Sequence, residues 1–471
     1  MVQVDKQQSR MNLNNGSLGR KLILQYGGLF VFSVAVAYLA VWASTSFLGN
    51  RSIPPASPLP SDEAANRQTI LFLEERTKTD PEDFIAQNKL AGYYLQQVRE
   101  TGDLTYLKLA AHASEISVNT LVPEHNLDGL AELTQVELTS HEFIAARKHA
   151  LQLIELQPDK SYPRQMLGDA LVELGEYDEA KKAYWLMEQF GGVQGLTRVA
   201  IEQRLARLEL LRGDPRTATE HFRKALRTAL AGPAPQRETV AWCRWQLGET
   251  AFSTGDYLTA EQHYRDALVT FPNYFRALAS LGRVRAAHGD WSGAAEQYEK
   301  AIRIFPDPSY VAALGDIYHL LGREQDAAAQ YKLVEAIARL SLVAGNLYNR
   351  QEALFYADHD IHLEKAYQNA VQEYAIRKDI YGADVVAWTA LKAGKLPESE
   401  AAIKEALKLG TRDSKLFYHA GMIAQAAGDR ASATSFLKQG LDLSPEFDPL
   451  QARIARKALA ALTEGNANAA N

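Results

Sequence analysis

The stretch "ADHDIH" is the densest group of residues whose types and spacing favour chemistry, and it holds Asp358, His359, Asp360 and His362. On a helix, two histidines three residues apart would share a face beside two carboxylates, a donor set that can bind a divalent metal. A helix end whose charges face water explains the same residues, and we favour that interpretation. We therefore predict no metal and no cofactor.

Other catalytic patterns are absent from the sequence, which contains no P-loop, no G-x-S-x-G, no C-x-x-C and no H-E-x-x-H. Glu137 and His141, at i and i+4, are expected to form an exposed pair on a helix. The one cysteine, Cys243, favours a buried thiol over an intermolecular bridge. With a net charge of −6, nothing suggests a nucleic-acid partner. We predict a protein that is not an enzyme, the minor alternative being one built around Asp358 to His362.

A repeat with a period near 34 residues organises most of the chain. Leu-Gly pairs at Gly248, Gly282 and Gly315 each lead seven residues later to a second glycine, then to an alanine and a tyrosine. Small residues allow two helices to cross closely, and the second glycine can end the first helix in the left-handed conformation. We expect the tyrosines to fill the space between hairpins. This pattern predicts stacked helix pairs, an all-α solenoid.

Two gaps exceed the period, and we expect the extra residues to form longer loops. The interval from Ala206 to Gly248 is 42 residues and includes Gly232 to Pro235, while that from Gly168 to Ala206 is 38 and includes Gly191 and Gly192. Insertions in repeat arrays fall in loops on one face, often the binding face, but a longer tolerated turn is the simpler explanation.

The N-terminal region predicts a membrane segment. No charged residue occurs from Leu22 to Asn50, a length sufficient for one transmembrane helix, and the residues before it are basic. The positive-inside rule then keeps residues 1–21 in the cytoplasm and places the repeats outside it. The expected location is the cytoplasmic (inner) membrane, with a single pass. The alternative is secretion after cleavage of a signal peptide, with Ala43-Ser44 as a conceivable site.

The stretches "LGDALVELGEYDEA" and "YVAALGDIYHLLGR" resemble tetratricopeptide repeats, and the chain is similar to uncharacterised bacterial secreted or membrane-anchored proteins of that type. The resemblance implies a right-handed superhelix with a groove for peptides. We divide the chain into a basic cytoplasmic leader (1–21), a transmembrane signal-anchor helix (22–48), a proline-rich linker (49–62), degenerate N-terminal helical repeats (63–126), a tetratricopeptide array (127–342), a degenerate helical pair (343–379), C-terminal repeats (380–447), and a capping helix with a disordered tail (448–471).

In this family, ligand-facing residues occupy fixed positions on the first helix of each repeat. Carried onto this sequence, the resemblance implies a partner-binding groove lined by Tyr162, Gln165, Asp169, Arg207, Trp242, Trp245, Glu249, Arg276, Arg283, Asp316, His319, Trp388 and Tyr418. Trp242 and Trp245 could instead pack under the Pro233–Pro235 insertion. No repeat has the lysine and asparagine pair with which chaperone-binding members hold a terminal carboxylate, so we do not expect recognition of a chaperone tail.

These features predict a membrane-anchored scaffold that binds a protein or peptide outside the cytoplasm and helps an envelope complex to assemble. Residues 22–48 provide the contact with the membrane. The alternative function is an accessory role in surface polysaccharide export or synthesis, in which aromatic groove residues stack on sugar faces.

Overall fold

The computed structural model describes residues 53–191, 195–343 and 350–469, and the chain divides by its contacts into Met1–Pro55 and Ala56–Asn471. The leader and the expected transmembrane helix at 22–48 lie outside the described residues. Residues 53–62, the described part of the proline-rich linker, have no helix or strand. Among the described helices, none is both long and apolar enough to cross a bilayer.

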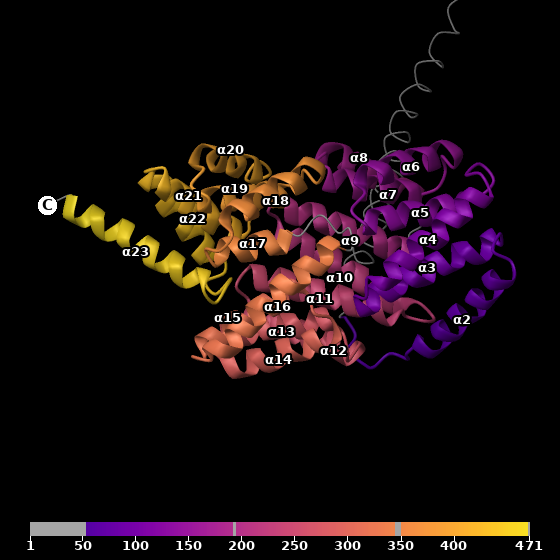
Figure 1. Ribbon diagram of the computed structural model, residues 1–471, viewed down its shortest axis with the longest axis horizontal. Coiled ribbons are helices and arrows are strands. Elements are labelled where there is room, and N and C mark those ends of the chain that lie inside the picture. The colour runs from indigo at the N-terminus through magenta and orange to yellow at the C-terminus, as the bar shows by residue number, and fades with distance from the viewer. Residues whose placement is uncertain (1–52, 192–194, 344–349, 470–471) are drawn as a thin grey trace, which may run out of the picture. The chain divides into compact units, whose positions relative to one another are not determined.

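The second unit is all helix, because its described residues form 22 helices and no strand. Figure 1 follows them in chain order. The helices are α2 (Glu63–Thr79), α3 (Phe84–Thr101), α4 (Thr105–Thr120), α5 (Leu127–Thr139), α6 (Phe143–Leu156), α7 (Tyr162–Glu173), α8 (Tyr177–Phe190), α9 (Gly195–Leu211), α10 (Pro215–Ala231), α11 (Arg237–Ser253), α12 (Tyr257–Thr270), α13 (Phe275–Ala287), α14 (Trp291–Ile304), α15 (Pro308–Leu320), α16 (Glu324–Val343), α17 (Arg350–Asp358), α18 (Leu363–Ile376), α19 (Ile380–Lys392), α20 (Leu396–Ala406), α21 (Ser414–Ala426), α22 (Arg430–Leu443) and α23 (Gln451–Ala469).

From α3 onward each odd-numbered helix packs on the even-numbered helix that follows, as in α11 with α12 and α13 with α14. Several odd-numbered helices of successive pairs also touch one another, such as α3 with α5 and α17 with α19, and α23 packs on α21 and α22. The expected all-α repeat solenoid is confirmed. Its right-handed sense stays a prediction.

The glycine that follows the first helix of a repeat has the conformation expected from the sequence. Gly255 and Gly289 have φ angles of +77° and +76°, which L-residues with a side chain rarely adopt. An aspartate comes next and caps the second helix: Asp256 accepts a hydrogen bond from the backbone N–H of Thr259 at 3.1 Å. The Gly-Asp dipeptide thus ends one helix and starts the next.

The glycine within the first helix allows the second helix to approach closely, as expected, and it is the tyrosine ring that fills the space. A Cβ placed on Gly248 would lie 2.4 Å from Cε1 of Tyr264, and one on Gly315 would lie 2.4 Å from Cε1 of Tyr331. The tyrosine ring therefore packs into its own hairpin, over the glycine, and does not simply fill the space between hairpins. The expectation for the tyrosines was incomplete, because the glycine at the helix crossing leaves room for the ring inside the hairpin.

The extra residues between Gly168 and Gly248 lengthen helices as well as loops. Helices α9, α10 and α11 have 17 residues each, whereas α12 has 14 and α13 has 13. The loop that we expected from the long interval between Ala206 and Gly248 does not hold all of the extra residues, because α10 ends at Ala231 and α11 begins at Arg237. These longer helices lie in the middle of the chain, where they form the wall of the groove described below.

The solenoid winds far enough for successive turns to touch. The backbone N–H of Ile380 donates to the Tyr177 hydroxyl across 203 residues, and the Thr411 hydroxyl donates to the Leu211 carbonyl across 200. These separations correspond to about six repeats of 34 residues. The start of α19 and the loop before α21 therefore contact the earlier part of the array, which lies beside them in Figure 1.

The contact between turns uses the glycines that separate the two helices of a repeat. A Cβ on Gly175 would lie 2.2 Å from the Lys378 carbonyl oxygen, and one on Gly213 would lie 2.5 Å from the Gly410 carbonyl oxygen. At Gly428, in the second turn, a Cβ would meet nothing within 4 Å. Glycine is required twice over at the first two positions, for its backbone conformation and for the close approach of the next turn.

Candidate functional site

Five odd-numbered helices, α3, α5, α7, α9 and α11, together line a cavity of about 750 Å³. A second cavity of about 430 Å³ adjoins it, because the two share Gln135, Gln203, Arg204 and Trp242. We call these two cavities the inner groove. It is closed on one side by α13, where Arg276 Nη1 donates to the Arg99 carbonyl oxygen at 3.2 Å.

Helical periodicity explains why these side chains gather in the groove. On α5 the lining residues are Asp128, Ala131, Glu132 and Gln135, which lie on one face at i, i+3, i+4 and i+7. The lining residues of α9 repeat the same spacing, at 196, 199, 200 and 203. Each first helix thus turns one mixed polar and apolar stripe toward the groove.

Two partly buried carboxylates in the groove lack a partner among the described residues, and a third unpaired carboxylate, Asp128, is exposed. Glu132 and Glu238 make no ion pair or hydrogen bond there. Burial raises the pKa of Glu132 to about 7, against the opposing effect of Arg99. Burial also raises the pKa of Glu238. Since desolvation disfavours the charged form of each carboxyl group, both would gain from a hydrogen-bond donor or a cation supplied by a ligand.

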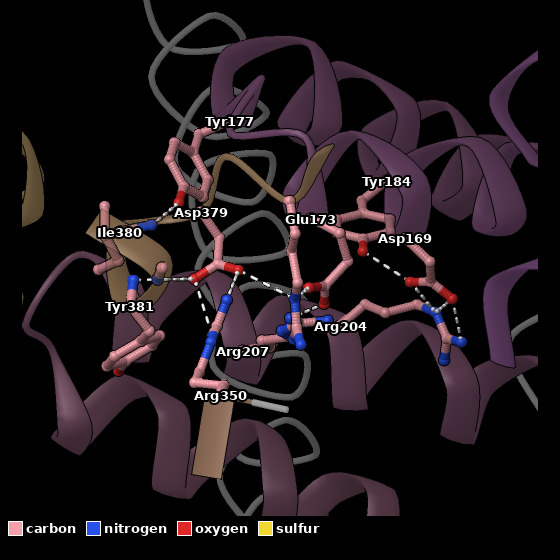
Figure 2. A network of polar contacts seen from close by, with 12 residues as sticks. Asp169, Glu173, Tyr177, Tyr184, Arg204, Arg207, Arg350, Asp379, Ile380 and Tyr381 are labelled. Carbon is pink, nitrogen blue, oxygen red and sulfur yellow. Dashed lines mark hydrogen bonds and ion pairs between the residues drawn. The ribbon is translucent and has the colours of Figure 1, made fainter. Parts of the chain in front are cut away.

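In three repeats the residue after the helix glycine carries a carboxylate that links successive repeats, whereas Arg283 follows Gly282. In each case the tyrosine of the same repeat donates to it, and a cationic or imidazole side chain of the next repeat pairs with it. The three sets are Tyr184, Asp169 and Arg204; Tyr264, Glu249 and Arg283; and Tyr331, Asp316 and His359. Figure 2 shows the first of them, in which Arg204 Nη2 lies 2.6 Å from Asp169 Oδ2.

A buried charge network joins the two turns beside the inner groove. Glu173 accepts hydrogen bonds from Arg207, on the next repeat, and from Arg377, on the second turn. Arg350 pairs with Asp379 at 2.8 Å (Figure 2). Burial alone would raise the pKa of Glu173, but the two guanidinium groups outweigh it and hold the pKa at about 2. The network thus keeps its charges and fixes the second turn against the first.

Of the residues expected to line a partner-binding groove, Tyr162, Gln165 and Trp242 line the larger cavity. Asp169 and Arg207 line the smaller one, where both are already paired as described above. The structure thus brings five of the expected residues to the inner groove.

The remaining expected residues are distributed elsewhere. Glu249 and Arg283 line a separate cavity between the two turns. Asp316 pairs with His359, and His319 is exposed beside Glu324. Trp388 and Tyr418, each 2 % exposed, are packed inside the C-terminal repeats, and the Trp388 ring stacks on His419 with ring centroids 4.3 Å apart.

Trp242 and Trp245 belong to a row of aromatic rings. Trp242 lies between Phe222 and Trp245, at centroid distances of 6.0 and 6.4 Å, and Trp245 continues to Tyr274 at 6.5 Å. The Trp245 indole N–H donates to the Ser280 hydroxyl at 2.9 Å. Trp242 therefore combines packing with a place in the groove, whereas Trp245 serves the contact between α11 and α13.

The "ADHDIH" stretch is only in part the solvated helix end that we expected, because Asp360 and His362 are exposed but Asp358 and His359 are not. Asp358 accepts the Trp388 indole N–H at 2.7 Å and pairs with Lys415 at 3.1 Å. His359 Nε2 lies 2.8 Å from Asp316 Oδ1. For these two residues the expectation was wrong, because a later part of the chain covers Asp358 and the preceding repeat holds His359. Within the described residues no group of acidic, histidine or cysteine side chains could hold a metal ion.

Glu137 and His141 do not form the exposed pair expected on a helix. Helix α5 ends at Thr139, and His141 has a φ of +64°, so the i, i+4 geometry is lost. Glu137 is buried and contacts Nδ1 of His149 at 2.9 Å. Cys243, by contrast, is buried as expected, and burial raises its thiol pKa to about 12.

The sequence analysis missed Glu132 and Glu238, and for Glu132 one reason is that the position count was not applied to the repeat that begins at Leu127. That count would have selected Asp128, Ala131 and Gln135, which all line the larger cavity, and Glu132 directly follows Ala131. Glu238 precedes the first counted position of its repeat and enters the groove only because α11 is long. No sequence signal marked it.

Comparison with known families identifies the repeats. Three family models, each described as tetratricopeptide repeat, match residues 164–184, 197–268, and 246–309 with 281–340. A search of curated proteins found no match. Arrays of such repeats present surfaces for protein partners, and the matched residues include the α7, α9 and α11 walls of the inner groove.

Solved structures share the helical repeat at low identity. Human IFIT1, in a dimer with PPP-AAAA, is 15 % identical with a TM-score of 0.44, over 69 % of this chain and 73 % of that one. Yeast Tom70 is 13 % identical with a TM-score of 0.31, over 80 % and 96 %. A tetratricopeptide repeat protein from Parabacteroides merdae is 15 % identical with a TM-score of 0.32, over 56 % and 99 %. These scores are too low to transfer any ligand to this chain.

Proposed function

We propose that this tetratricopeptide repeat protein is a non-catalytic scaffold that binds an extended segment of a partner polypeptide in the inner groove. The observation that carries the proposal is the groove itself, about 750 Å³ in its larger part and lined by five successive first helices. Its lining alternates amide side chains such as Gln165 and Gln203 with the rings of Tyr162 and Trp242. Amides suit a peptide backbone, and aromatic rings carry much of the energy at binding surfaces.

The unpaired carboxylates specify the charge of the partner. Glu132 and Glu238 would each be stabilised in the ionised form by a lysine or arginine side chain of the bound segment. Arg99 and Lys89 also line the cavity, so the carboxylates are not in a uniformly negative field. We therefore propose a segment that presents a basic residue between polar ones.

We further propose that the scaffold is held at the cytoplasmic membrane by residues 22–48, with the repeats outside the cytoplasm, where it helps an envelope complex to assemble. The support is the absence of charge from Leu22 to Asn50 and the basic residues before it. Secretion after cleavage of the leader is the alternative. Fusion of a reporter enzyme that folds only outside the cytoplasm, placed after residue 62, tests the orientation: an inactive reporter would contradict it.

Binding is tested with the full-length chain in mild detergent and fluorescent, unstructured peptides of serine and glycine that contain one lysine or one glutamate. We expect Glu132→Gln and Glu238→Gln each to weaken binding of the lysine peptide about tenfold, which corresponds to about 1.4 kcal/mol. Glu220→Gln, at an exposed residue of α10 outside the groove, is the matched control and should bind as the unaltered protein does. Equal binding of the two peptides would contradict the charge preference.

The second candidate function, handling of a surface polysaccharide, draws support from Tyr162 and Trp242, whose rings line the same cavity. Neutral oligosaccharides added to the peptide assay separate the two. Displacement of the peptide by an oligosaccharide would favour the polysaccharide function, and a lack of displacement would favour the peptide scaffold.

A further inference from the structure

A third cavity, of about 370 Å³, lies between the two turns of the solenoid and adjoins the smaller part of the inner groove at Leu210. We call it the inter-turn cavity. The first turn contributes Glu249 and Arg283 from α11 and α13, and the second contributes Arg412, Asp413 and other residues around the start of α21. Both turns must be in place for this cavity to exist.

The inter-turn cavity contains hydrogen-bond donors that nothing in the described residues satisfies. The Ser414 side-chain oxygen is buried without a partner, and the whole residue is 4 % exposed. Nε of Arg283, which can only donate, is buried without a partner as well. Arg412 makes no ion pair in the described part of the chain. Unsatisfied buried polar atoms are uncommon, and here two line one cavity.

The acceptors in this cavity are already occupied. Glu249 accepts hydrogen bonds from Tyr264 at 2.7 Å, from Ser280 at 2.8 Å and from Arg283 at 2.6 Å. Asp413 caps α21 by accepting from the backbone N–H of Leu416 at 2.9 Å. The cavity therefore has hydrogen-bond donors without a partner and few free acceptors. A ligand rich in acceptor atoms would satisfy these donors.

The charges agree with the donor inventory. Three cationic side chains, Arg283, Arg412 and Lys415, line the cavity with two carboxylates, Glu249 and Asp413. Burial raises the pKa of Asp413, so this carboxyl group opposes an anion less than a solvated aspartate would. Ser414 is also the first residue of α21, a helix of 13 residues whose N-terminus favours negative charge.

We propose that the inter-turn cavity binds a small oxyanion, a phosphate or a carboxylate, held by Arg283 from the first turn and by Arg412 and Ser414 from the second. Because its ligands come from both turns, the bound anion stabilises the wound form of the solenoid. This site does not depend on peptide binding in the inner groove.

The test titrates inorganic phosphate and acetate separately into the full-length protein in mild detergent, by calorimetry and by thermal unfolding. We expect one of the two to bind and to raise the unfolding temperature. Binding of phosphate but not acetate identifies a phosphate source, and the reverse identifies a carboxylate source. If neither releases heat nor raises the unfolding temperature, the proposal is wrong.

Two variants locate the bound anion. Arg412→Gln and Ser414→Ala should each weaken binding about tenfold, the effect of losing one charge-assisted hydrogen bond. Ser414→Ala should leave the anion-free protein at least as stable, because the hydroxyl it removes has no partner. Arg216→Gln, at an exposed arginine that lines none of these cavities, is the control. Unchanged affinity in both cavity variants would overturn the assignment.

Discussion

Replacing the glycine between the two helices of a repeat can distinguish two effects on stability: local backbone strain and the contact between successive turns of the solenoid. Gly175 and Gly428 both have positive φ, +75° and +80°, and both follow the first helix of a repeat. Only Gly175 meets the next turn, where a Cβ would lie 2.2 Å from the Lys378 carbonyl oxygen. Comparing Gly175→Ala with Gly428→Ala therefore isolates the packing of one turn on the other.

The expected magnitudes follow from two terms. An alanine in the left-handed conformation costs about 1–2 kcal/mol, and this term applies to both variants. At Gly175 the second turn must also move, since its backbone oxygen cannot rotate away, and overpacking of this kind costs about 1–3 kcal/mol. We expect Gly428→Ala to lose about 1–2 kcal/mol and Gly175→Ala about 2–5 kcal/mol.

Guanidinium unfolding of the full-length chain, followed by far-ultraviolet circular dichroism, measures both losses. Gly213→Ala, where a Cβ would lie 2.5 Å from the Gly410 carbonyl oxygen, should behave like Gly175→Ala. Equal losses in Gly175→Ala and Gly428→Ala would refute the contact between turns, and with it the inter-turn cavity.

Three further outcomes are expected. Glu132→Gln should be as stable as the unaltered protein near pH 4.5 and more stable above pH 7 by about 2–3 kcal/mol. The reason is that the carboxyl pKa of Glu132 is raised to about 7, so the unaltered protein loses stability as the pH rises from 4.5 to 7. Urea unfolding at several pH values checks this, and the same pH dependence of stability in both proteins would contradict it. Glu173→Gln leaves Arg207 and Arg377 without their carboxylate and should lower the free energy of unfolding by about 3–5 kcal/mol at pH 7. This loss should become smaller as the pH falls from 4.5 toward the pKa of about 2 that Glu173 has in the folded protein. Chemical unfolding at several pH values measures it, and an unchanged stability at pH 7 would contradict the network. Cys243 should not react with a thiol reagent at pH 8 until the protein unfolds, since its pKa is raised to about 12; rapid labelling of the native protein would show that the thiol is accessible.

Much of the repeat could be predicted because its determinants lie within 34 residues of one another. The pair Gly248 and Gly255 fixes where a helix can be crossed and where it must end, and Asp256 starts the next helix. Each of these effects is local, so spacing alone identifies them. The family resemblance, and not the spacing, implied that Tyr162, Gln165 and Trp242 line a groove, and all three line the larger cavity.

Predictions of solvent exposure failed where a segment distant in the sequence covers the residue concerned. Asp358 looked like a solvated residue at the end of a helix, but Lys415 and Trp388 from later repeats enclose it. Trp388 counted as a groove position, yet the stacked repeats leave it 2 % exposed. Periodicity assigns a face to a residue, but whether that face meets water or another repeat depends on how the solenoid winds.

By itself the sequence determined the two-helix unit and its turn, since glycine conformation and helix capping act between near neighbours. Only the tertiary structure decided that Gly175 meets Lys378 and that Arg377 reaches Glu173, about six repeats apart. The physical reason is that each repeat adds a small rotation, and the sum of these rotations sets which residues meet after a full turn. The lengthened helices α9 to α11 contribute to the total rotation, and no sequence motif predicts their contribution.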